Sequence, residues 1–149
     1  MLSMRGWLAI PLLAFTAQAG AVNPAELLDP RDAFRLSVRT VDDRTAQIDF
    51  RIAPGYYLYR DRFRFETESG RTIADAVLPT GKTKEDPFFG RSQIYRDHVS
   101  IKVPLSQADL ARKQVRLKIV SQGCADVGVC YIPQEQWVNV KLDRFQEEQ

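Results

Sequence analysis

Residues 46–52 read Ala-Gln-Ile-Asp-Phe-Arg-Ile, a stretch in which apolar and polar side chains alternate without a break. A period of two places the apolar side chains on one face of a β-strand and the polar ones on the other. The same pattern recurs at residues 34–38, 63–66, 99–103, 115–119 and 137–142. Strands of this kind are typical of antiparallel sheets that cover a core with one face and meet water with the other.

Turn-forming residues separate these stretches, as at Pro54-Gly55, Ser69-Gly70 and Pro79-Thr80-Gly81. Helix signals are confined to residues 23–28, where an Asn precedes a Pro, and to residues 106–113. Six to eight short strands at this spacing predict an all-β fold, an immunoglobulin-like antiparallel β-sandwich. An antiparallel barrel is the alternative fold.

Length and composition limit the number of domains and the kinds of partner that this chain is expected to have. A chain of 149 residues has room for a single domain with a leader. Its 21 Lys and Arg residues against 19 Asp and Glu residues give a net charge of +2 without a basic block, so nucleic acid is not an expected partner. His98 is the single histidine, and we therefore expect no metal site. We also expect a monomer.

Residues 1–21 have the pattern of a secretory signal peptide. Arg5 supplies a positive start, and the apolar run from Gly6 to Phe15 is too short for a transmembrane anchor. Cleavage after Ala19 and cleavage after Ala21 both fit the small residues at this position. We expect residues 22–149 to form the mature domain in the periplasm, where disulfides persist. A soluble product and a piece of a longer membrane protein are both compatible with this pattern.

The two cysteines lie in residues 122–133, which read Gln-Gly-Cys-Ala-Asp-Val-Gly-Val-Cys-Tyr-Ile-Pro. Five residues separate Cys124 from Cys130, unlike the Cys-x-x-Cys spacing of thioredoxin. Because strands are predicted on both sides, the pair is expected at the tip of a hairpin, where Gly123 and Gly128 permit a sharp backbone path.

Spacing alone is compatible with two roles for a Cys124–Cys130 disulfide. A bridge over so short a loop adds only about 2 kcal/mol of stability, and structural bridges more often join distant strands. A tight, accessible bridge is the readily reduced kind. Asp126 inside the loop disfavours an aggressive thiolate, which favours a disulfide that waits for an incoming thiolate. The alternative is a secreted immunoglobulin-like binding module with a purely structural loop disulfide.

Residues 122–133 resemble the active-site loop of the N-terminal periplasmic domain of the thiol:disulfide interchange protein DsbD. Two upstream segments resemble that domain in the same order and at similar separations: residues 54–60, Pro-Gly-Tyr-Tyr-Leu-Tyr-Arg, and residues 86–97, Asp-Pro-Phe-Phe-Gly-Arg-Ser-Gln-Ile-Tyr-Arg-Asp. The resemblance extends over about residues 30–143 and implies an immunoglobulin-like redox domain.

The resemblance also implies an activity, that of a protein-disulfide reductase acting by thiol-disulfide exchange, as one domain of a larger enzyme. Cys130 would form the mixed disulfide with partners and Cys124 would resolve it, with no cofactor beyond this redox-active disulfide. Electrons would come from a thioredoxin-like domain of the DsbD C-terminal type. They would pass to periplasmic partners such as the disulfide isomerase DsbC and the thioredoxin of cytochrome c maturation. A related copper-stress reductase domain with other clients is a further alternative, and a full-length DsbD would lie in the inner membrane.

A cap loop over the cysteines is implied as well, and it corresponds here to Asp86, Pro87, Phe88, Phe89 and Gly90. Phe88 takes the position of the ring that shields the disulfide, and Gly90 provides a hinge. Pro87 stands where the family sequences carry an acidic residue, which removes a donor and a charge. Without the resemblance, Phe88 and Phe89 would be interpreted as ordinary core or edge contacts.

Three further residues are implicated in the site. Tyr57 and Tyr59 match tyrosines that line it, and strand alternation places both on one face. Asp126 either tunes the cysteine pair or holds the turn between the two cysteines.

Overall fold

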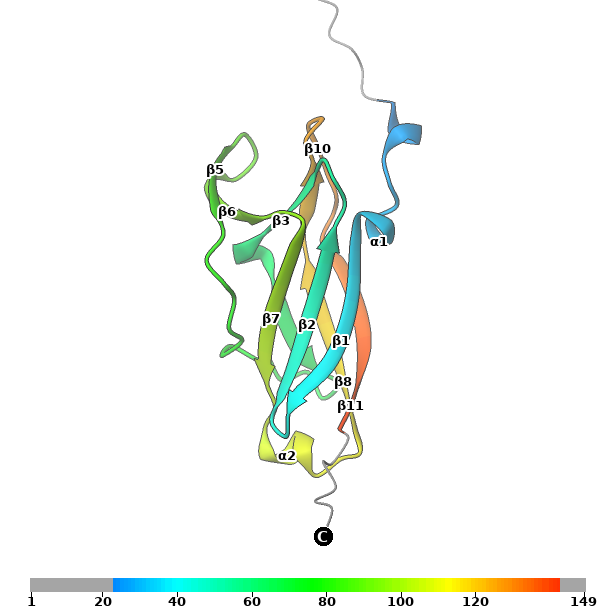
Figure 1. The fold of residues 1–149 in the computed structure, drawn as a ribbon, viewed down its shortest axis with the longest axis vertical. Helices are drawn as coiled ribbons and strands as arrows, with labels where there is room; N and C mark the ends of the chain where they lie inside the picture. The colour runs from blue at the N-terminus through cyan, green and yellow to red at the C-terminus, as the bar shows by residue number, and fades with distance from the viewer. Residues whose placement is uncertain (1–22, 143–149) are drawn as a thin grey trace, which may run out of the picture.

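The computed structural model describes residues 23–142 of the chain (Figure 1). The predicted signal peptide, residues 1–21, lies outside the described residues. No helix within residues 23–142 is long and apolar enough to cross a membrane.

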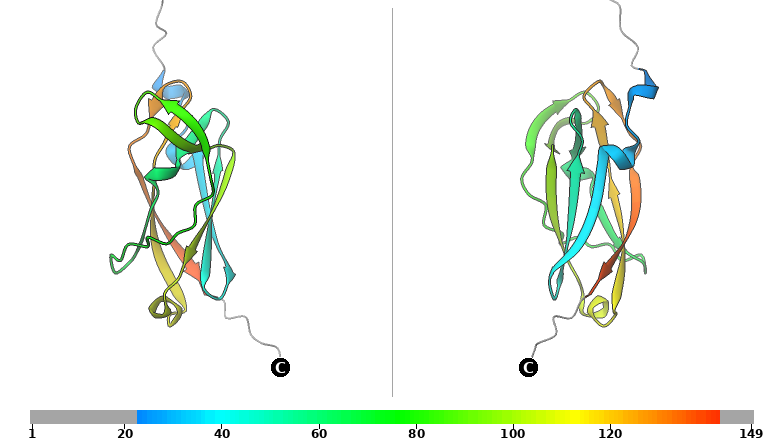
Figure 2. Two further views of the ribbon diagram at one scale, coloured as in Figure 1. Left: turned by 90° about the vertical axis from the view of Figure 1, so that its left-hand side faces the viewer. Right: turned by 45° about the vertical axis from the view of Figure 1, so that its right-hand side comes forward.

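Two antiparallel sheets packed face to face form the body of the domain (Figures 1 and 2). The first has the order β1-β2-β7, with β1 at Phe34–Asp42, β2 at Thr45–Ile52 and β7 at His98–Pro104. The second has the order β11-β8-β4, with β11 at Gln134–Lys141, β8 at Gln114–Ser121 and β4 at Arg64–Thr67. All six stretches of alternating sequence lie in or at the edge of these strands, and their apolar residues, such as Ile48, Phe50 and Leu117, fill the core. The predicted all-β sandwich is confirmed.

A third antiparallel sheet lies at one end of the sandwich, in the order β10-β9-β3-β6-β5 (Figure 1). Its strands are β3 (Tyr56–Tyr59), β5 (Lys82–Asp86), β6 (Gly90–Tyr95), β9 (Gly123–Ala125) and β10 (Val129–Cys130). The prediction of six to eight strands is therefore too low, since residues 23–142 contain eleven. The added strands show no alternation because they are short, and all four residues of β3 are buried.

The helical segments are single turns: η1 (Pro24–Glu26), α1 (Pro30–Ala33), η2 (Arg60–Arg62) and α2 (Gln107–Leu110). The helix predicted at residues 106–113 ends early, although Ser106 and Asp109 form the capping box that starts it. The chain then enters β8 at Gln114. Helix α2 and the end of β11 lie at the pole of the sandwich opposite to β10 (Figure 1).

Gly123 joins the third sheet to the sandwich at a point of close approach. A Cβ atom at this position would lie 2.5 Å from Phe34 Cζ and closer still to the backbone oxygen of Tyr57. Because Phe34 begins β1 and Tyr57 lies in β3, only a residue without a side chain allows β9 to fit between them.

We predict that Gly123→Ala lowers the free energy of unfolding by about 2–3 kcal/mol, because backbone and ring must move to admit the methyl group. Urea denaturation of the variant measures this loss. Gly70→Ala is the matched control: Gly70 has a φ of +83° but no atom within 4 Å of an added Cβ, so only the dihedral cost of about 1 kcal/mol applies. Equal losses in both variants would contradict a packing constraint at Gly123.

Candidate functional site

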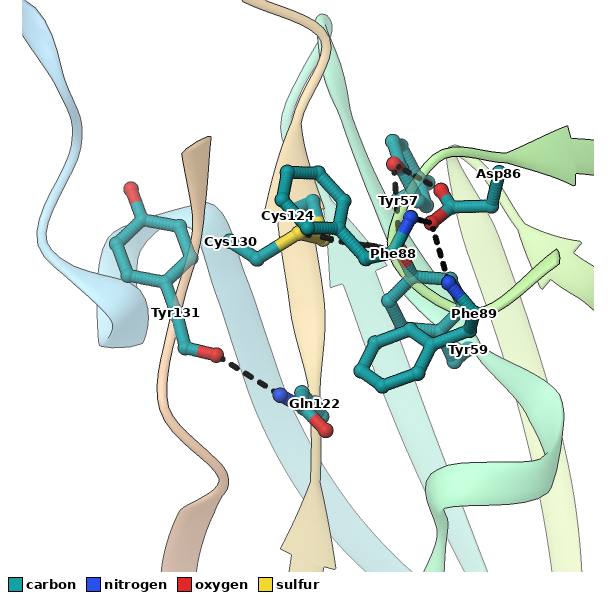
Figure 3. The surroundings of a disulfide bond; sticks show 9 residues. All are labelled: Tyr57, Tyr59, Asp86, Phe88, Phe89, Gln122, Cys124, Cys130 and Tyr131. Atoms are coloured by element: carbon teal, nitrogen blue, oxygen red, sulfur yellow. Dashed lines mark hydrogen bonds between the residues drawn. A yellow bond between two sulfur atoms is a disulfide. The ribbon is translucent and has the colours of Figure 1, made fainter. Parts of the chain in front are cut away.

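The two cysteines are joined by a disulfide across the β9–β10 hairpin, where Cys124 and Cys130 are directly paired (Figure 3). The turn between the strands is closed by a hydrogen bond from Gly128 N–H to Ala125 O at 3.0 Å. Gly128 has a φ of +94°, a conformation that favours glycine. The predicted position of the pair at a hairpin tip is confirmed.

The two cysteine residues differ in their exposure to solvent. Cys124 is fully buried at 0% exposure, whereas Cys130 is half-buried. The reason is their place in the sheet, since β9 lies between β3 and β10 while β10 is the edge strand. The bridge is thus less accessible than a loop tip suggests, and an incoming group meets Cys130 first.

Tyr57 and Tyr59 form a wall beside the disulfide, as the sequence predicts for neighbours on one face of a strand. Tyr57 pairs with Cys124 across the β3–β9 ladder, and the two tyrosine rings meet edge to face at 5.4 Å. The Tyr59 hydroxyl lies 3.2 Å from Cys124 Sγ and 3.8 Å from Cys130 Sγ. Disulfide sulfurs carry no hydrogen, so the hydroxyl is the donor. Burial raises the pKa of both tyrosines, which keeps both hydroxyls protonated at neutral pH.

Asp86 is a buried carboxylate at the end of β5, with an exposure of 5%. It accepts hydrogen bonds from the Tyr57 hydroxyl at 2.8 Å and from the N–H groups of Phe88 and Phe89 at 2.8 and 3.2 Å (Figure 3). Burial acts to raise the pKa of Asp86, but the hydrogen bonds that the carboxylate accepts outweigh burial and hold the pKa below its ordinary value. Asp86 therefore ties the loop that follows it to the tyrosine wall.

That loop, residues 87–89, connects β5 to β6 and lies beside the disulfide. The Phe89 ring packs edge-on against Tyr59 at 4.8 Å. Phe88 is 52% exposed, and its ring lies over the disulfide in the view of Figure 3. Pro87 lacks an N–H group, and Asp86 bonds instead to the two N–H groups that follow, an arrangement in which a proline fits.

Asp126, in the turn between the cysteines, forms a bidentate ion pair with Arg96. The two guanidinium nitrogens lie 3.0 and 2.8 Å from the carboxylate oxygens. Arg96 also donates to Tyr56 O at 3.3 Å, so it ties the hairpin to β3. This pairing lowers the pKa of Asp126. No sequence pattern assigns Arg96 a role, although it lies in the third quoted segment. The ion pair anchors the turn between the cysteines to Arg96.

Tyr131, next to Cys130, holds the N-terminal segment against the same hairpin. Its hydroxyl donates to Leu28 O at 2.6 Å, while Leu28 N–H donates to the Tyr56 hydroxyl at 2.9 Å. Gln122 in turn donates to Tyr131 O at 3.2 Å (Figure 3). The hairpin is therefore fixed on one side by Arg96 and on the other by Leu28.

The arrangement has the chemistry of an exchangeable disulfide. One cysteine is partly exposed, the other is buried beside a hydroxyl donor, and an aromatic loop lies next to both. Within residues 23–142 no group of three or more His, Cys, Asp or Glu side chains is placed to hold a metal ion.

Comparison with known proteins gives consistent results. Residues 24–142 match the family described as thiol:disulfide interchange protein DsbD, N-terminal. Thiol:disulfide interchange protein DsbD 2 of Pseudomonas aeruginosa is 39% identical over 111 residues, which are 74% of this chain and 18% of that protein. The chain thus spans under a fifth of the length of this relative.

Two solved structures from Neisseria meningitidis are similar to most of the chain. The reduced DsbD N-terminal domain has 32% sequence identity and a TM-score of 0.72, covering 80% of this chain and 94% of that one. The complex between the DsbD N-terminal and PilB N-terminal domains has 32% identity and a TM-score of 0.63, covering 76% and 87%. The predicted immunoglobulin-like sandwich agrees with both.

We predict that Asp86→Asn lowers the free energy of unfolding at pH 7 by about 2 kcal/mol, the usual size for hydrogen bonds to a charged group. Because the folded pKa of Asp86 is depressed, its contribution is complete above the unfolded pKa of about 3.9. It is lost as the pH falls through the folded pKa, since the unfolded chain takes up the proton first. The unfolding curves of wild type and variant should therefore converge in acid.

Urea denaturation at a series of pH values measures this convergence. Asp61→Asn is the control, because Asp61 has a side-chain exposure of 75% and pairs only with its neighbour Arg60 among the ion pairs of residues 23–142. It should leave the free energy of unfolding almost unchanged. A gap between wild type and Asp86→Asn that stays constant into acid would contradict the prediction.

Proposed function

The chain belongs to the family of DsbD N-terminal domains, and from this premise we propose that it is a thiol-disulfide exchange module. Its Cys124–Cys130 disulfide accepts electrons from a thioredoxin-like donor and passes them to the disulfides of thioredoxin-like partners. The activity is that of a protein-disulfide reductase, with the disulfide as the redox group and no further cofactor.

The observation that carries the proposal is the asymmetry of the two sulfurs around Tyr59. Cys130 is the more exposed of the two cysteines and therefore the natural target of an incoming thiolate. Cys124 is buried and accepts a hydrogen bond from Tyr59, which stabilises negative charge as that sulfur becomes a thiolate. This supports Cys130 as the residue that binds partners and Cys124 as the one that resolves the complex.

Reduction of the module then proceeds in two exchanges. A donor thiolate attacks Cys130 Sγ, a mixed disulfide forms, and Cys124 leaves as a thiolate that takes up a proton. The second donor thiolate attacks the donor sulfur of the mixed disulfide and releases Cys130. Two electrons have moved, the donor is now a disulfide, and the module is a dithiol.

Transfer to a client reverses these roles. The Cys130 thiolate attacks the client disulfide and one client sulfur leaves as a thiolate. Cys124 then attacks Cys130 Sγ, which restores the Cys124–Cys130 disulfide and releases the client with both sulfurs reduced.

Exposed apolar side chains near the disulfide support a protein partner. Val127 in the hairpin turn is 59% exposed, and Ile132, two residues after Cys130, is 78% exposed. Together with Phe88 they give an apolar rim of the kind that protein interfaces use. The complex formed by the Neisseria relative supports docking of another protein domain. Clients of the DsbC type and of the cytochrome c maturation type, and a donor of the DsbD C-terminal type, are our proposal for this chain.

The proposed compartment is the periplasm, reached through the predicted signal peptide, an oxidising compartment in which disulfides form and persist. As part of a longer protein of the relatives' length, the domain would belong to an inner-membrane enzyme.

The proposed cap function of Phe88 is tested by removal of its ring. Removal of the ring in Phe88→Ala should raise the rate at which dithiothreitol reduces the disulfide several-fold, because the ring obstructs the approach to the sulfurs. Alkylation of the released thiols, followed by mass spectrometry, measures the rate. Val127→Ala removes an exposed apolar side chain from the hairpin turn instead and should leave the rate unchanged. A wild-type rate in Phe88→Ala would overturn the cap assignment.

A trapping experiment tests the exchange function itself. Cys124→Ala leaves Cys130 as a thiol without its resolving partner, so that mixing with an oxidised DsbC-type isomerase or with an oxidised thioredoxin should yield a covalent adduct after acid quenching. The mass of the adduct should equal the sum of the two proteins, and dithiothreitol should release both.

Cys130→Ala is the matched control, because its remaining thiol on Cys124 is buried and should give little adduct. The absence of an adduct from Cys124→Ala with both proteins would favour the binding module with a structural disulfide.

A further inference from the structure

A second surface feature lies beside the tyrosine wall, on the side of η2 and β6. It is a cleft of about 350 Å³ whose lining includes Tyr59, Phe89, Arg62, Arg64, Arg91 and Asp61. We call it the arginine cleft. Neither the sequence patterns nor the exchange function assigns it a role.

The arginine cleft shares a wall with the disulfide site. Tyr59 is one of the residues that line the cleft, and its hydroxyl contacts both sulfurs. Phe89 packs on that ring at 4.8 Å, and the Arg62 guanidinium lies 4.0 Å from the centre of the Phe89 ring. A group bound in the cleft is therefore separated from the sulfurs by a single layer of aromatic side chains.

The arginines that line the cleft carry positive charge and, in the part of the chain that the structure describes, form no ion pairs with neighbouring carboxylates. Arg62, Arg64 and Arg91 are all exposed. Within residues 23–142 none of the three lies within 4.0 Å of a carboxylate oxygen, although arginines elsewhere on the domain form such pairs. Asp61, the carboxylate of the lining, is 3.4 Å from Arg60, which does not line the cleft.

Contacts with neighbouring groups also hold two of the guanidinium groups, those of Arg62 and Arg64, in orientations that suit an oxygen ligand. Arg64 donates to the backbone oxygens of Asp61 and Phe63, at 3.0 and 2.6 Å, which holds its guanidinium in place and leaves other N–H groups free. Arg62 is oriented by the Phe89 ring. A planar guanidinium fixed in this way binds a carboxylate through two parallel hydrogen bonds, and three like charges around one cleft favour an anion.

We propose that the arginine cleft binds an Asp or Glu side chain at the rim of the partner's active site, so that an acidic rim is what the module selects. The proposal rests on the exchange function above, because the cleft adjoins the sulfur that a partner must approach. A carboxylate in the cleft would orient the partner and raise its rate of association, with a strong dependence on salt.

The test uses three reduced peptides, each with one cysteine, that differ only in three flanking residues: Glu, Gln or Lys. Each peptide thiolate attacks the Cys124–Cys130 disulfide, and the mixed disulfide is followed by mass after acid quenching. The triple variant Arg62→Gln, Arg64→Gln, Arg91→Gln is compared with wild type. The control is Arg44→Gln, Arg112→Gln, Lys113→Gln, which removes the same charge from exposed residues in the β1–β2 turn and in the segment between α2 and β8.

For the Glu peptide at about 0.01 M ionic strength, we expect wild type to react about 10-fold faster than the cleft variant. The Gln peptide should react equally with both, which also shows that the variant is folded, and the Lys peptide should react faster with the variant. At about 1 M ionic strength, where the screening length is about 3 Å, the differences should vanish. The control variant should react with the Glu peptide at nearly the wild-type rate.

Two results would overturn the proposal: equal rates of the Glu peptide with wild type and cleft variant, or an equal loss in the control variant, which would reduce the effect to net charge. Because the probe is a peptide, the result does not depend on any thioredoxin-like protein. Failure of the Cys124→Ala trapping with intact peptide selection would overturn the exchange function alone, and trapping without selection would overturn the cleft alone.

Discussion

The pairing of β9 with β3 is the constraint on which the rest of the site depends. Register places Tyr57 opposite Cys124, so the disulfide and the tyrosine wall are parts of one ladder rather than two surfaces brought together by side chains. The pairing is possible only because Gly123 admits Phe34 and the β3 backbone at close range. The redox hairpin is thus set by the main chain, which is the most rigid means the fold has of holding two sulfurs beside a hydroxyl.

The electrostatics of the site follow from that framework. Two carboxylates lie near the disulfide, and the negative charge of each is stabilised by a different kind of group. Asp86 is held by hydroxyl and N–H donors, and Asp126 by the guanidinium of Arg96. The sequence suggests that Asp126 works against a thiolate in its loop. In the structure the ion pair offsets much of that repulsion, so a thiolate formed at Cys124 meets a hydroxyl donor rather than an unpaired negative charge.

The parts of the fold that could be predicted are those with a local signature. Alternation marks the strands of the sandwich, and the spacing of Cys124 and Cys130 between two such strands marks the hairpin. Apart from that hairpin, the end sheet has no such signature, because β3 is buried on both faces. The placement of its tyrosines and of residues 87–89 near the disulfide could be predicted through the family resemblance alone. Arg96 and Asp126 are 30 positions apart in the sequence, and Tyr131 and Leu28 are 103 positions apart. No local sequence pattern predicts contacts between residues so far apart.

The end of β11 lies at the pole opposite to β10, and this matters whenever the domain is joined to another protein. Lys141, the last residue of β11, lies at the far pole, about 25 Å from the start of this eight-residue strand. A tether attached there leaves the end that carries the disulfide unobstructed, because the length of the sandwich separates the tether from the disulfide. A fusion placed before Leu28, by contrast, would emerge beside the hairpin and crowd the very surface that has to receive other proteins.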